Sequence, residues 1–556
     1  MEWLRQLVRA IRNLTRIVRA EPIWAITALV VSPIRLIRHL FSVLILFLIT
    51  GLVLGLGMKL VLGSLLGLPH DSNIYQTVMM LTAIVVILVG LRALFQPLIM
   101  RYGGPEGDAT HGSARFATDA ETRPLAGDAG LLIGRDSRSG RLLRYSGPSH
   151  LLTIAPTRTG KGVGTIIPNL LDYPGSVICI DPKGENARIT ARHRARFGPV
   201  HILDPFDATG LAHAAFNPLE RIDPTGLDLA DECMTLADAL VYDPPGEAGE
   251  AHWNEEAKAL IAGIILSIAT GEPPATRNLA TLRDRLTLAP QAFAAMLTAM
   301  QGQGGLAGRA ANRHLGKSDR EAAGVLSAAQ RHTHFLDSPR MTALLGRSDF
   351  AFADVKARAT TVYLVLPPDR LATYARWLRL MLAQSLTDLA RAPAQNPAAP
   401  AKPVLFLLDE FAALGRLDPI ERAMGLMAGY GIQLWPILQD VHQLRALYER
   451  RAGTFLSNAA VLQIFGVNDH DSAKLVSDLL GQETVVFETM SRALDSEQSG
   501  ISFGEQHVAR PLLTPDEVRT LPDDRELLFL SGQRPIVATK LRYYADREFA
   551  GRFDRA

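Results

Sequence analysis

At 556 residues the chain is longer than one ordinary domain, so its length predicts two or three cooperating units. Its 58 basic and 56 acidic residues give a formal net charge of only +2, which excludes a global charge excess as the means of binding nucleic acid or an anionic membrane. Two cysteines, Cys179 and Cys233, lie far apart without metal-ligand spacing, which argues against a disulfide framework and fits a reducing compartment.

Two long uncharged stretches lie near the N-terminus, where the apolar content of the chain is concentrated. Phe41–Met58 continues past Lys59 into further apolar residues, and Ile74–Leu91 follows a short polar segment at His70–Asn73. Each stretch approaches or exceeds the roughly 20 residues that span a bilayer, so the sequence predicts a transmembrane helical hairpin. A cleaved signal peptide is the alternative, but this hydrophobic segment starts late, is long and recurs at once.

Arginines flank the hairpin on both sides and set its orientation. Because basic residues beside a span favour the cytoplasm, both ends of the hairpin are predicted to be cytoplasmic. The first five arginines recur at spacings of four and three, which indicates an amphipathic helix on anionic lipid; a solvated helix docked onto the body is the alternative. The arginines are Arg5, Arg9, Arg12, Arg16, Arg19, Arg35 and Arg38 before the first span and Arg92, Arg101 and Arg115 after the second.

The rest of the chain alternates short apolar runs with helical patterns, starting after a joint rich in Gly and Pro at residues 103–108. Runs such as 150–155, 176–180 and 404–408 predict buried strands of a parallel sheet. Residues 224–345 are rich in Ala and Leu and lack strand patterns, so they predict an inserted all-helical domain.

A candidate phosphate-binding loop follows the first of these runs. A strand before it and a helical pattern after it give the context in which backbone amides and a helix N-terminus hold phosphates, with Lys161 on the β and γ groups. Ala155 stands where the motif has its first Gly, and Gly162 where a Ser or Thr would bind magnesium, so an ordinary strand-to-helix turn is the alternative. The candidate residues are Pro156, Thr157, Arg158, Thr159, Gly160, Lys161, Gly162 and Val163.

Two further strands end in polar side chains, at the edge where open α/β sheets bind ligands. Asp409 and Glu410 follow the run 404–408, so we assign magnesium binding to Asp409 and orientation or deprotonation of the attacking water to Glu410. Gln439 follows the run 432–438, where it would sense the γ-phosphate. A solvated acidic pair and a helix-capping amide are the alternatives. ATP and magnesium are the predicted cofactors.

Short segments spread along nearly the whole chain match one family in order. Beside the hairpin they are His111–Phe116, Pro156–Gly164, Pro168–Leu171, Asp181–Asn186, Phe216–Leu219, His252–Asn254, Leu407–Phe411, Leu438–Asp440, Phe465–Asp469 and Arg510–Pro515. Through them the chain resembles the coupling proteins of type IV secretion systems, the TraG/VirD-type conjugative DNA transfer family. In that family a Gly directly after the loop lysine is common, which removes the objection to Gly162. The group that replaces the hydroxyl on magnesium stays open, with Thr165 or water as candidates.

The resemblance implies an α/β fold, a RecA-like P-loop NTPase with an inserted all-α domain that helps choose substrates, preceded by the transmembrane hairpin. Residues 391–402 are of low complexity and predict a flexible surface crossing within it. The predicted division begins with a basic amphipathic segment, 1–40, and two transmembrane helices, 41–103. The nucleotide-binding domain then comprises two segments, 104–223 and 346–556, which flank the all-α domain, 224–345.

The resemblance also implies a homohexameric ring at the bacterial inner membrane, with the N-terminus and the ATPase body in the cytoplasm. Such rings hand single-stranded DNA with its covalently attached relaxase, or protein effectors, to other components of the secretion channel. A ring ATPase normally needs an arginine from the neighbouring subunit. Arg144, Arg158 and Arg416 are candidates, although each could equally be a surface or phosphate-side arginine. Residues 181–185 could contact nucleotide or form a salt network at a strand end.

The sequence therefore predicts an ATPase that moves conjugative DNA or a nucleoprotein. The same architecture exporting only protein effectors is one alternative, and the residues do not separate the two because no basic patch stands out. A DNA pump of the FtsK type is another, but further spans and a C-terminal winged-helix reader are not apparent. A non-catalytic membrane scaffold is the third, and intact Lys161, Asp409, Glu410 and Gln439 argue against it. Segment 483–509 receives no assignment.

Overall fold

The computed structural model describes residues 22–102, 111–241, 251–392, 402–492 and 501–555, with short stretches before residue 22. These residues form two units, one of residues up to 113 with 483–509 and the other of 114–482 with 510–556. Several sequence predictions lie outside the described residues. They are the five N-terminal arginines, the side chains of Arg35, Arg38 and Arg101, the joint at 103–108 and residues 393–401 of the predicted surface crossing.

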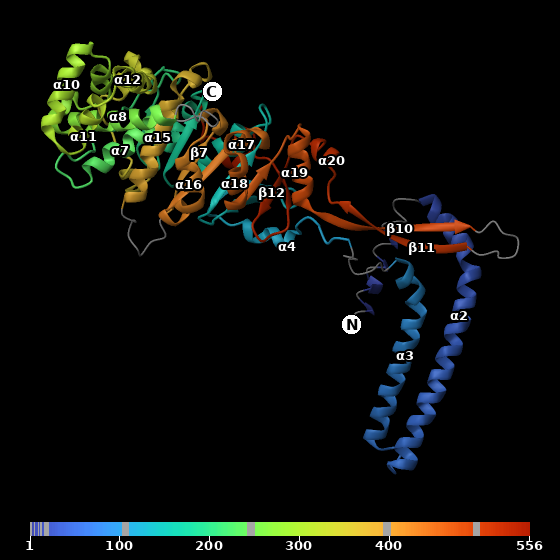
Figure 1. The fold of residues 1–556 in the computed structure, drawn as a ribbon. Helices are drawn as coiled ribbons and strands as arrows, with labels where there is room; N and C mark the ends of the chain where they lie inside the picture. Colours follow the sequence, from blue (N-terminus) through green and yellow to red (C-terminus); the bar gives the residue numbers. More distant parts are fainter. Residues whose placement is uncertain are drawn as a thin grey trace. The chain divides into compact units, whose positions relative to one another are not determined.

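Two long helices dominate the first unit. Helix α2 (Pro22–Lys59) continues into a π-helical turn, η1 (Leu60–Leu65), and α3 (Asn73–Tyr102) runs back beside it (Figure 1). The segments 39–65 and 73–99 are each long and apolar enough to cross a membrane, and almost none of their side chains is buried within the protein. Exposed apolar surface of this extent fits lipid better than water.

Close packing joins the two long helices at a glycine. A Cβ added at Gly90 of α3 would lie 2.7 Å from the ring of Phe47 on α2, so a larger residue would displace this ring. Small residues at helix interfaces in lipid allow such close approach. The first unit also holds most of a two-stranded sheet, β10 (Gln482–Arg492) and β11 (Ile501–Pro511), which contains the described residues of the segment left unassigned by the sequence.

An eleven-stranded mixed sheet forms the centre of the second unit, in the order β2-β1-β13-β12-β9-β3-β8-β7-β4-β6-β5. The seven strands from β9 to β5 are parallel, as predicted, whereas β12, β13, β1 and β2 pair antiparallel. The antiparallel edge was not expected; its pairs β1–β2 and β12–β13 are joined by loops too short for a parallel crossover. The strands are β1 (Leu131–Asp136), β2 (Leu142–Tyr145), β3 (His150–Ile154), β4 (Val177–Asp181), β5 (Val200–Leu203), β6 (Thr361–Val365), β7 (Val404–Leu408), β8 (Ile432–Leu438), β9 (Ala459–Ile464), β12 (Arg525–Leu530) and β13 (Ile536–Thr539).

Helices connect and flank these strands. Between β5 and β6 the described residues form helices and no strand, and Figure 1 shows α7, α8 and α10 to α12 gathered at one end of the sheet. The bounds of an all-α domain at 224 and 345 stay a prediction. The helices of this unit are α4 (Asp119–Thr122), α5 (Ile167–Asp172), α6 (Glu185–Arg194), α7 (Leu229–Leu240), α8 (Ala251–Gly271), α9 (Leu279–Leu286), α10 (Pro290–Gln303), α11 (Gly305–Leu315), α12 (Asp319–Thr333), α13 (Pro339–Leu344), α14 (Asp354–Ala357), α15 (Pro368–Arg391), α16 (Asp418–Leu426), α17 (Val441–Tyr448), α18 (Ala452–Asn458), α19 (His470–Leu480) and α20 (Pro515–Arg519).

Side chains of alternate residues bury both faces of the sheet. On β7, Phe406 and Leu408 pack into a core shared with the helices of residues 229–344, whereas Leu405 and Leu407 pack into a second core on the opposite face. This explains why the central strands are uninterrupted apolar runs, since a strand covered on both faces has no polar side. Cys179 and Cys233 are buried within these cores, and both are free, as predicted.

One polar network crosses the interior of the sheet. Gln463 on β9 accepts hydrogen bonds from the hydroxyls of Thr153 (2.8 Å) and Thr165 (3.1 Å), and donates to Glu526 on β12 (2.7 Å). Glu526 is fully buried, and its other carboxylate oxygen has no hydrogen-bond partner among the described residues. Burial raises the pKa of Glu526 to about 8, while hydrogen bonding from Gln463 and the charge of Lys540 lower it less strongly.

The raised pKa of Glu526 predicts how stability changes with pH. The folded state keeps a proton that the unfolded carboxyl, with a pKa of 4.5, releases. The stability that this carboxyl contributes is therefore fully present below pH 4.5 and is lost as the pH rises through about 8. Glutamine is neutral at both pH values. We therefore expect the Glu526→Gln variant to unfold at a higher temperature than wild type at pH 8 and at the same temperature near pH 4.5. Calorimetry of the full chain at both values would contradict this if the variant were less stable at pH 8.

Candidate functional site

The candidate phosphate-binding loop lies between β3 and a helical segment, in the context predicted from the sequence. The segment begins as a π-helical turn, η3 (Gly162–Ile166), and continues as α5. The φ angle is positive at Arg158 (64°) and Gly160 (96°) but not at Thr159 between them, and it is −55° at Lys161. Alternation of this kind is the backbone pattern that forms concave anion sites, and the N–H of Thr159 within it donates to the carbonyl of Pro156 (3.4 Å).

Two glycines of the loop have open space beside them. A Cβ added at Gly160 or Gly162 would meet no atom within 4 Å, so both positions border open space. The left-handed φ at Gly160 also favours glycine there. Because free N–H groups and the start of a helix attract anions, the phosphates of a nucleotide fit this opening.

Four of the predicted site residues converge beside the loop. The ammonium of Lys161 donates to Glu410 Oε1 and lies 3.5 Å from Asp409 Oδ1. The amide of Gln439 donates to the second oxygen of Glu410 (2.9 Å), and the N–H of Glu410 donates to Asp409 Oδ1 (2.9 Å). Glu410 therefore links the loop lysine to the polar residue that follows β8.

The order of the strands accounts for this convergence. Strand β8 lies between β3 and β7 and is parallel to both, so the residues that follow all three reach the same edge of the sheet. Glu410 has a left-handed backbone, with φ 49°, an unusual conformation for a residue with a side chain. Gln443 on α17 accepts the backbone N–H of Gln439 (3.1 Å) and so fixes the start of the turn after β8.

Burial sets the electrostatics of the acidic residues. Burial raises the pKa of Asp409, and the positive charge of Lys161 opposes that rise. Burial also raises the pKa of Asp181, at the end of β4, to about 6, and the charge of Asp409 contributes to the rise. A cation bound at Asp409 would stabilise its ionised form, so this carboxylate fits a divalent ion such as magnesium.

Thr165, one candidate for the missing magnesium ligand, is already engaged elsewhere. Its side chain is buried, and its hydroxyl donates to Gln463 in the interior of the sheet. Asp181 is likewise committed, because it accepts the N–H of Ala187 (2.8 Å) and so holds the first turn of α6. Lys183 is exposed and Glu185 is half-buried at the start of that helix. The contacts of Asp181 favour its structural role.

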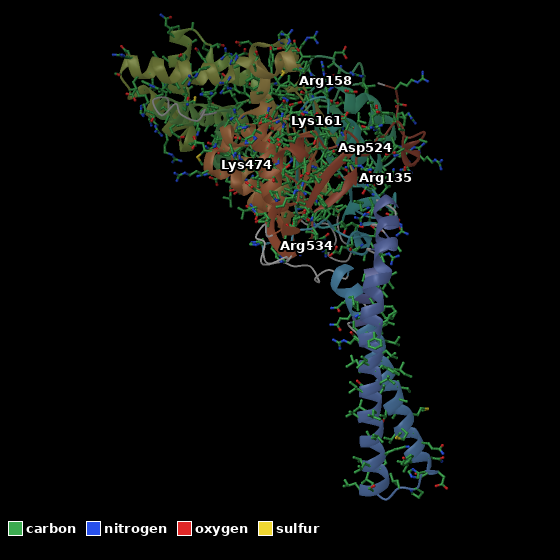
Figure 2. The ribbon with its side chains drawn as sticks, turned by 90° about the vertical axis from the view of Figure 1, so that its right-hand side faces the viewer. Arg135, Arg158, Lys161, Lys474, Asp524 and Arg534 are labelled. Atoms are coloured by element: carbon green, nitrogen blue, oxygen red, sulfur yellow. The ribbon has the colours of Figure 1, made fainter. Side chains whose placement is uncertain are left out.

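The three candidate arginines differ in their surroundings. Arg144 forms an ion pair with Asp172, and Arg416 donates to Asp418 (2.8 Å). Arg158 is exposed, and within the described residues it forms no ion pair (Figure 2). Because Arg158 belongs to the loop itself, it lies beside the candidate site of its own chain, whereas an arginine that acts on a neighbouring chain would lie farther from that site.

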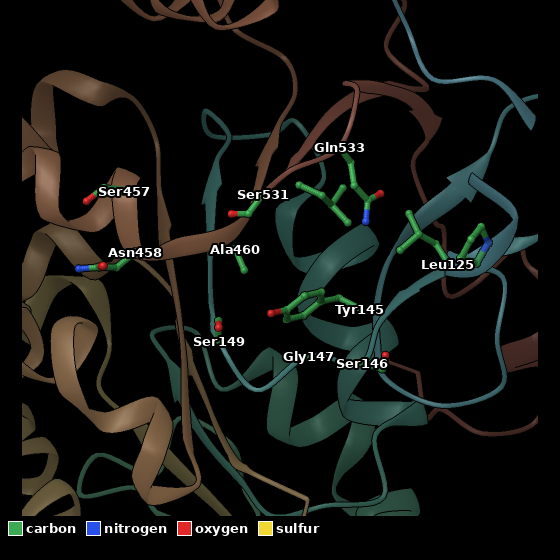
Figure 3. A pocket seen from close by; sticks show the side chains of 12 residues that line it. Leu125, Tyr145, Ser146, Gly147, Ser149, Ser457, Asn458, Ala460, Ser531 and Gln533 are labelled. Atoms are coloured by element: carbon green, nitrogen blue, oxygen red, sulfur yellow. The ribbon is translucent and has the colours of Figure 1, made fainter. Parts of the chain in front are cut away.

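A separate cavity lies at the opposite edge of the sheet. Its 620 Å³ volume opens beside Ser149 and Asn458, which precede β3 and β9, and beside Leu530, which ends the antiparallel β12 (Figure 3). None of its lining residues carries a charged side chain. It therefore lacks the groups that would hold a triphosphate, and the loop edge remains the candidate site.

Residues near the C-terminus contact the loop, although the sequence did not single them out. Lys540, directly after β13, donates to the carbonyl of Thr159 (2.7 Å), and the N–H of Tyr543 donates to the carbonyl of Val163 (3.4 Å). A Cβ added at Gly164 would lie 2.9 Å from the carbonyl oxygen of Leu541. A pairing 381 residues apart leaves no local pattern, so no signal in the sequence could have revealed it.

Comparison with known proteins identifies relatives over most of the chain. The family described as Type IV secretory system Conjugative DNA transfer matches residues 121–555. Conjugal transfer protein TraG of Escherichia coli is 30% identical over 446 residues, which are 74% of this chain and 69% of the relative. Protein VirD4 of Agrobacterium fabrum is 29% identical over 492 residues, which are 83% of this chain and 70% of the relative.

Solved structures share the fold. The bacterial conjugative coupling protein TrwBdeltaN70 matches with a TM-score of 0.59 at 17% identity, covering 79% of this chain and 97% of that chain. The plasmid coupling protein TrwB in complex with ADP and Mg2+ matches with a TM-score of 0.57 at 16% identity, covering 77% of this chain and 92% of that chain. The chain thus has the P-loop NTPase fold of these proteins, preceded by two long apolar helices.

Proposed function

Because this chain belongs to the type IV secretory system conjugative DNA transfer family, we propose that it couples ATP hydrolysis to the transfer of DNA into a secretion channel. The observation that carries the proposal is the convergence of Lys161, Glu410 and Gln439 at the edge of the sheet beside an open phosphate-binding loop. Hydrolysis needs a cation for the phosphates and a base for the water, and these residues supply both.

Each residue has a distinct role in this proposal. The loop amides and Lys161 bind the β- and γ-phosphates, and Asp409 would hold magnesium. When bound, magnesium offsets the negative charge of the phosphates. Glu410 accepts a proton from the attacking water, and Gln439 orients the carboxylate of Glu410 toward it. A TrwB structure that holds ADP and Mg2+ supports these two ligands.

The proposed setting is the bacterial inner membrane. The segments 39–65 and 73–99 would span it as a hairpin, with the ATPase body in the cytoplasm, because arginines flank both ends. The chain would act as a homohexamer, since a ring gives each site a neighbour that can supply an arginine. Its proposed partners are single-stranded DNA with a covalently attached relaxase and the other components of the channel.

Stimulation by DNA tests the proposed substrate. We expect single-stranded DNA to raise the ATPase rate of the full chain, reconstituted in lipid nanodiscs, by about tenfold, a change of about 1.4 kcal/mol in the barrier. Phosphate release would be measured with single-stranded DNA, double-stranded DNA and no DNA. Activity that is present but unchanged by either DNA would contradict the DNA assignment and favour export of protein effectors alone.

A further inference from the structure

We propose that Lys540 is a positioning residue for the phosphate-binding loop. Its ammonium donates a 2.7 Å hydrogen bond to the carbonyl oxygen of Thr159, in the middle of the loop. The inference rests on the proposed function, since it gives Lys540 a role in nucleotide binding at the same site. Lys540 acts through the loop backbone and is not itself assigned a contact with the nucleotide.

The geometry of the peptide unit makes this contact directional. In a planar trans peptide the carbonyl oxygen and the following N–H point in opposite directions. When Lys540 holds the Thr159 carbonyl, the N–H of Gly160 must therefore point away from Lys540. A Cβ added at Gly160 would meet no atom within 4 Å, so there is open space beside this residue for a phosphate. A charged donor on the carbonyl also polarises the peptide and strengthens its N–H as a donor.

The surroundings of Lys540 hold its ammonium in place. It is half-buried, and its Nζ lies 5.0 Å from the centroid of the Phe465 ring, within the range of a cation–π contact. Burial lowers the pKa of Lys540, and the nearby Glu526 opposes this. Partial burial of an ammonium costs stability unless its N–H groups form hydrogen bonds, and the Thr159 carbonyl accepts one of these bonds.

Thr159 is also held from two other directions. Its hydroxyl donates to the carbonyl of Pro156 (2.6 Å) inside the loop. Gly466, just after β9, has a φ of 65°, and a Cβ added there would lie 2.4 Å from Thr159 Cγ2. The turn after β9 and the residue after β13 therefore both fix this threonine. The chain then continues over the next helix, where Tyr543 N–H donates to the Val163 carbonyl.

Replacement of Lys540 by methionine keeps most of the side-chain volume and removes the donor. We expect Lys540→Met to weaken binding of fluorescent ADP and ATP analogues about tenfold, or about 1.4 kcal/mol. The turnover rate at saturating ATP and the unfolding temperature should stay close to wild type, because the catalytic residues are untouched. Lys540→Arg should recover most of the affinity, since arginine also donates from a positive charge.

The matched control is Lys474→Met. Lys474 is exposed on α19 and is not among the residues assigned to the site, so its variant should bind nucleotide as wild type does. Gly466→Ala would displace the same threonine, Thr159, because the added Cβ would lie 2.4 Å from its Cγ2. This variant should therefore also weaken nucleotide binding. The full chain in nanodiscs would be used for all variants.

The outcomes separate this inference from the proposed function. A wild-type chain that binds and hydrolyses ATP while Lys540→Met keeps full nucleotide affinity would overturn the role of Lys540 alone. A lowered unfolding temperature and turnover rate with unchanged affinity would likewise overturn it, because the lysine would then be only structural. A wild-type chain that binds neither nucleotide would overturn the proposed function and this inference together.

Discussion

Glu410→Gln should abolish ATP turnover while leaving nucleotide binding close to wild type. Glutamine has the shape of glutamate but cannot accept a proton from water, so we expect the turnover rate to fall at least about 100-fold, the lower end of the contribution of a general base. One oxygen of Glu410 faces Lys161 and the other faces Gln439, which places the carboxylate between the loop and β8. No other carboxylate at the described site accepts from both residues.

Binding should survive because Glu410 has no role in holding the phosphates. Removal of its negative charge leaves the cation of Lys161 less neutralised, which favours an anionic nucleotide. Titration with a fluorescent ATP analogue and measurement of phosphate release would separate binding from turnover. Glu220→Gln, the same substitution at an exposed position, is the matched control. Normal turnover by Glu410→Gln would show that another group activates the water.

The parallel strands of the sheet and the loop could be predicted because their signals are local. Uninterrupted apolar runs indicate strands that are covered on both faces, and β7 and β8 match the runs at 404–408 and 432–438. Polar residues that follow parallel strands share one edge of the sheet, so Asp409, Glu410 and Gln439 could be expected together. The loop context followed from the Gly and Lys spacing between a strand and a helix.

The antiparallel edge and the support behind the loop could not be predicted. Strands β12 and β13 come last in the chain but lie between β1 and β9, and such long-range pairing depends on the whole fold. Lys540 and Gly466 therefore gave no sign that they contact Thr159. The role of Thr165 also escaped prediction, since its partner Gln463 lies in the interior of the sheet, 298 residues along the chain.

Lys161→Ala should abolish nucleotide binding itself. A hydrogen bond to a charged group contributes about 1.5–3 kcal/mol. Lys161 would face the charges of two phosphates, so we expect the dissociation constant to rise at least about 100-fold, or about 2.7 kcal/mol. The same titration as for Glu410→Gln would be used, and Lys474→Ala is the matched control at an exposed lysine. Unchanged affinity would refute the assignment of this loop to phosphate binding.

A second consequence of Lys161→Ala distinguishes lost binding from lost structure. Burial raises the pKa of Asp409, and the charge of Lys161 limits that rise. Without this charge the pKa of Asp409 should rise further, so the folded state of the variant should hold a proton more tightly than the unfolded chain does. Its stability should then fall relative to wild type as the pH increases and match it at acid pH, where the carboxyl is protonated in both states. If the variant lost affinity and was equally unstable at every pH, the loss would come from misfolding; if it lost affinity with this pH dependence, Lys161 would be shown to balance the acidic pair as well as to hold the phosphates.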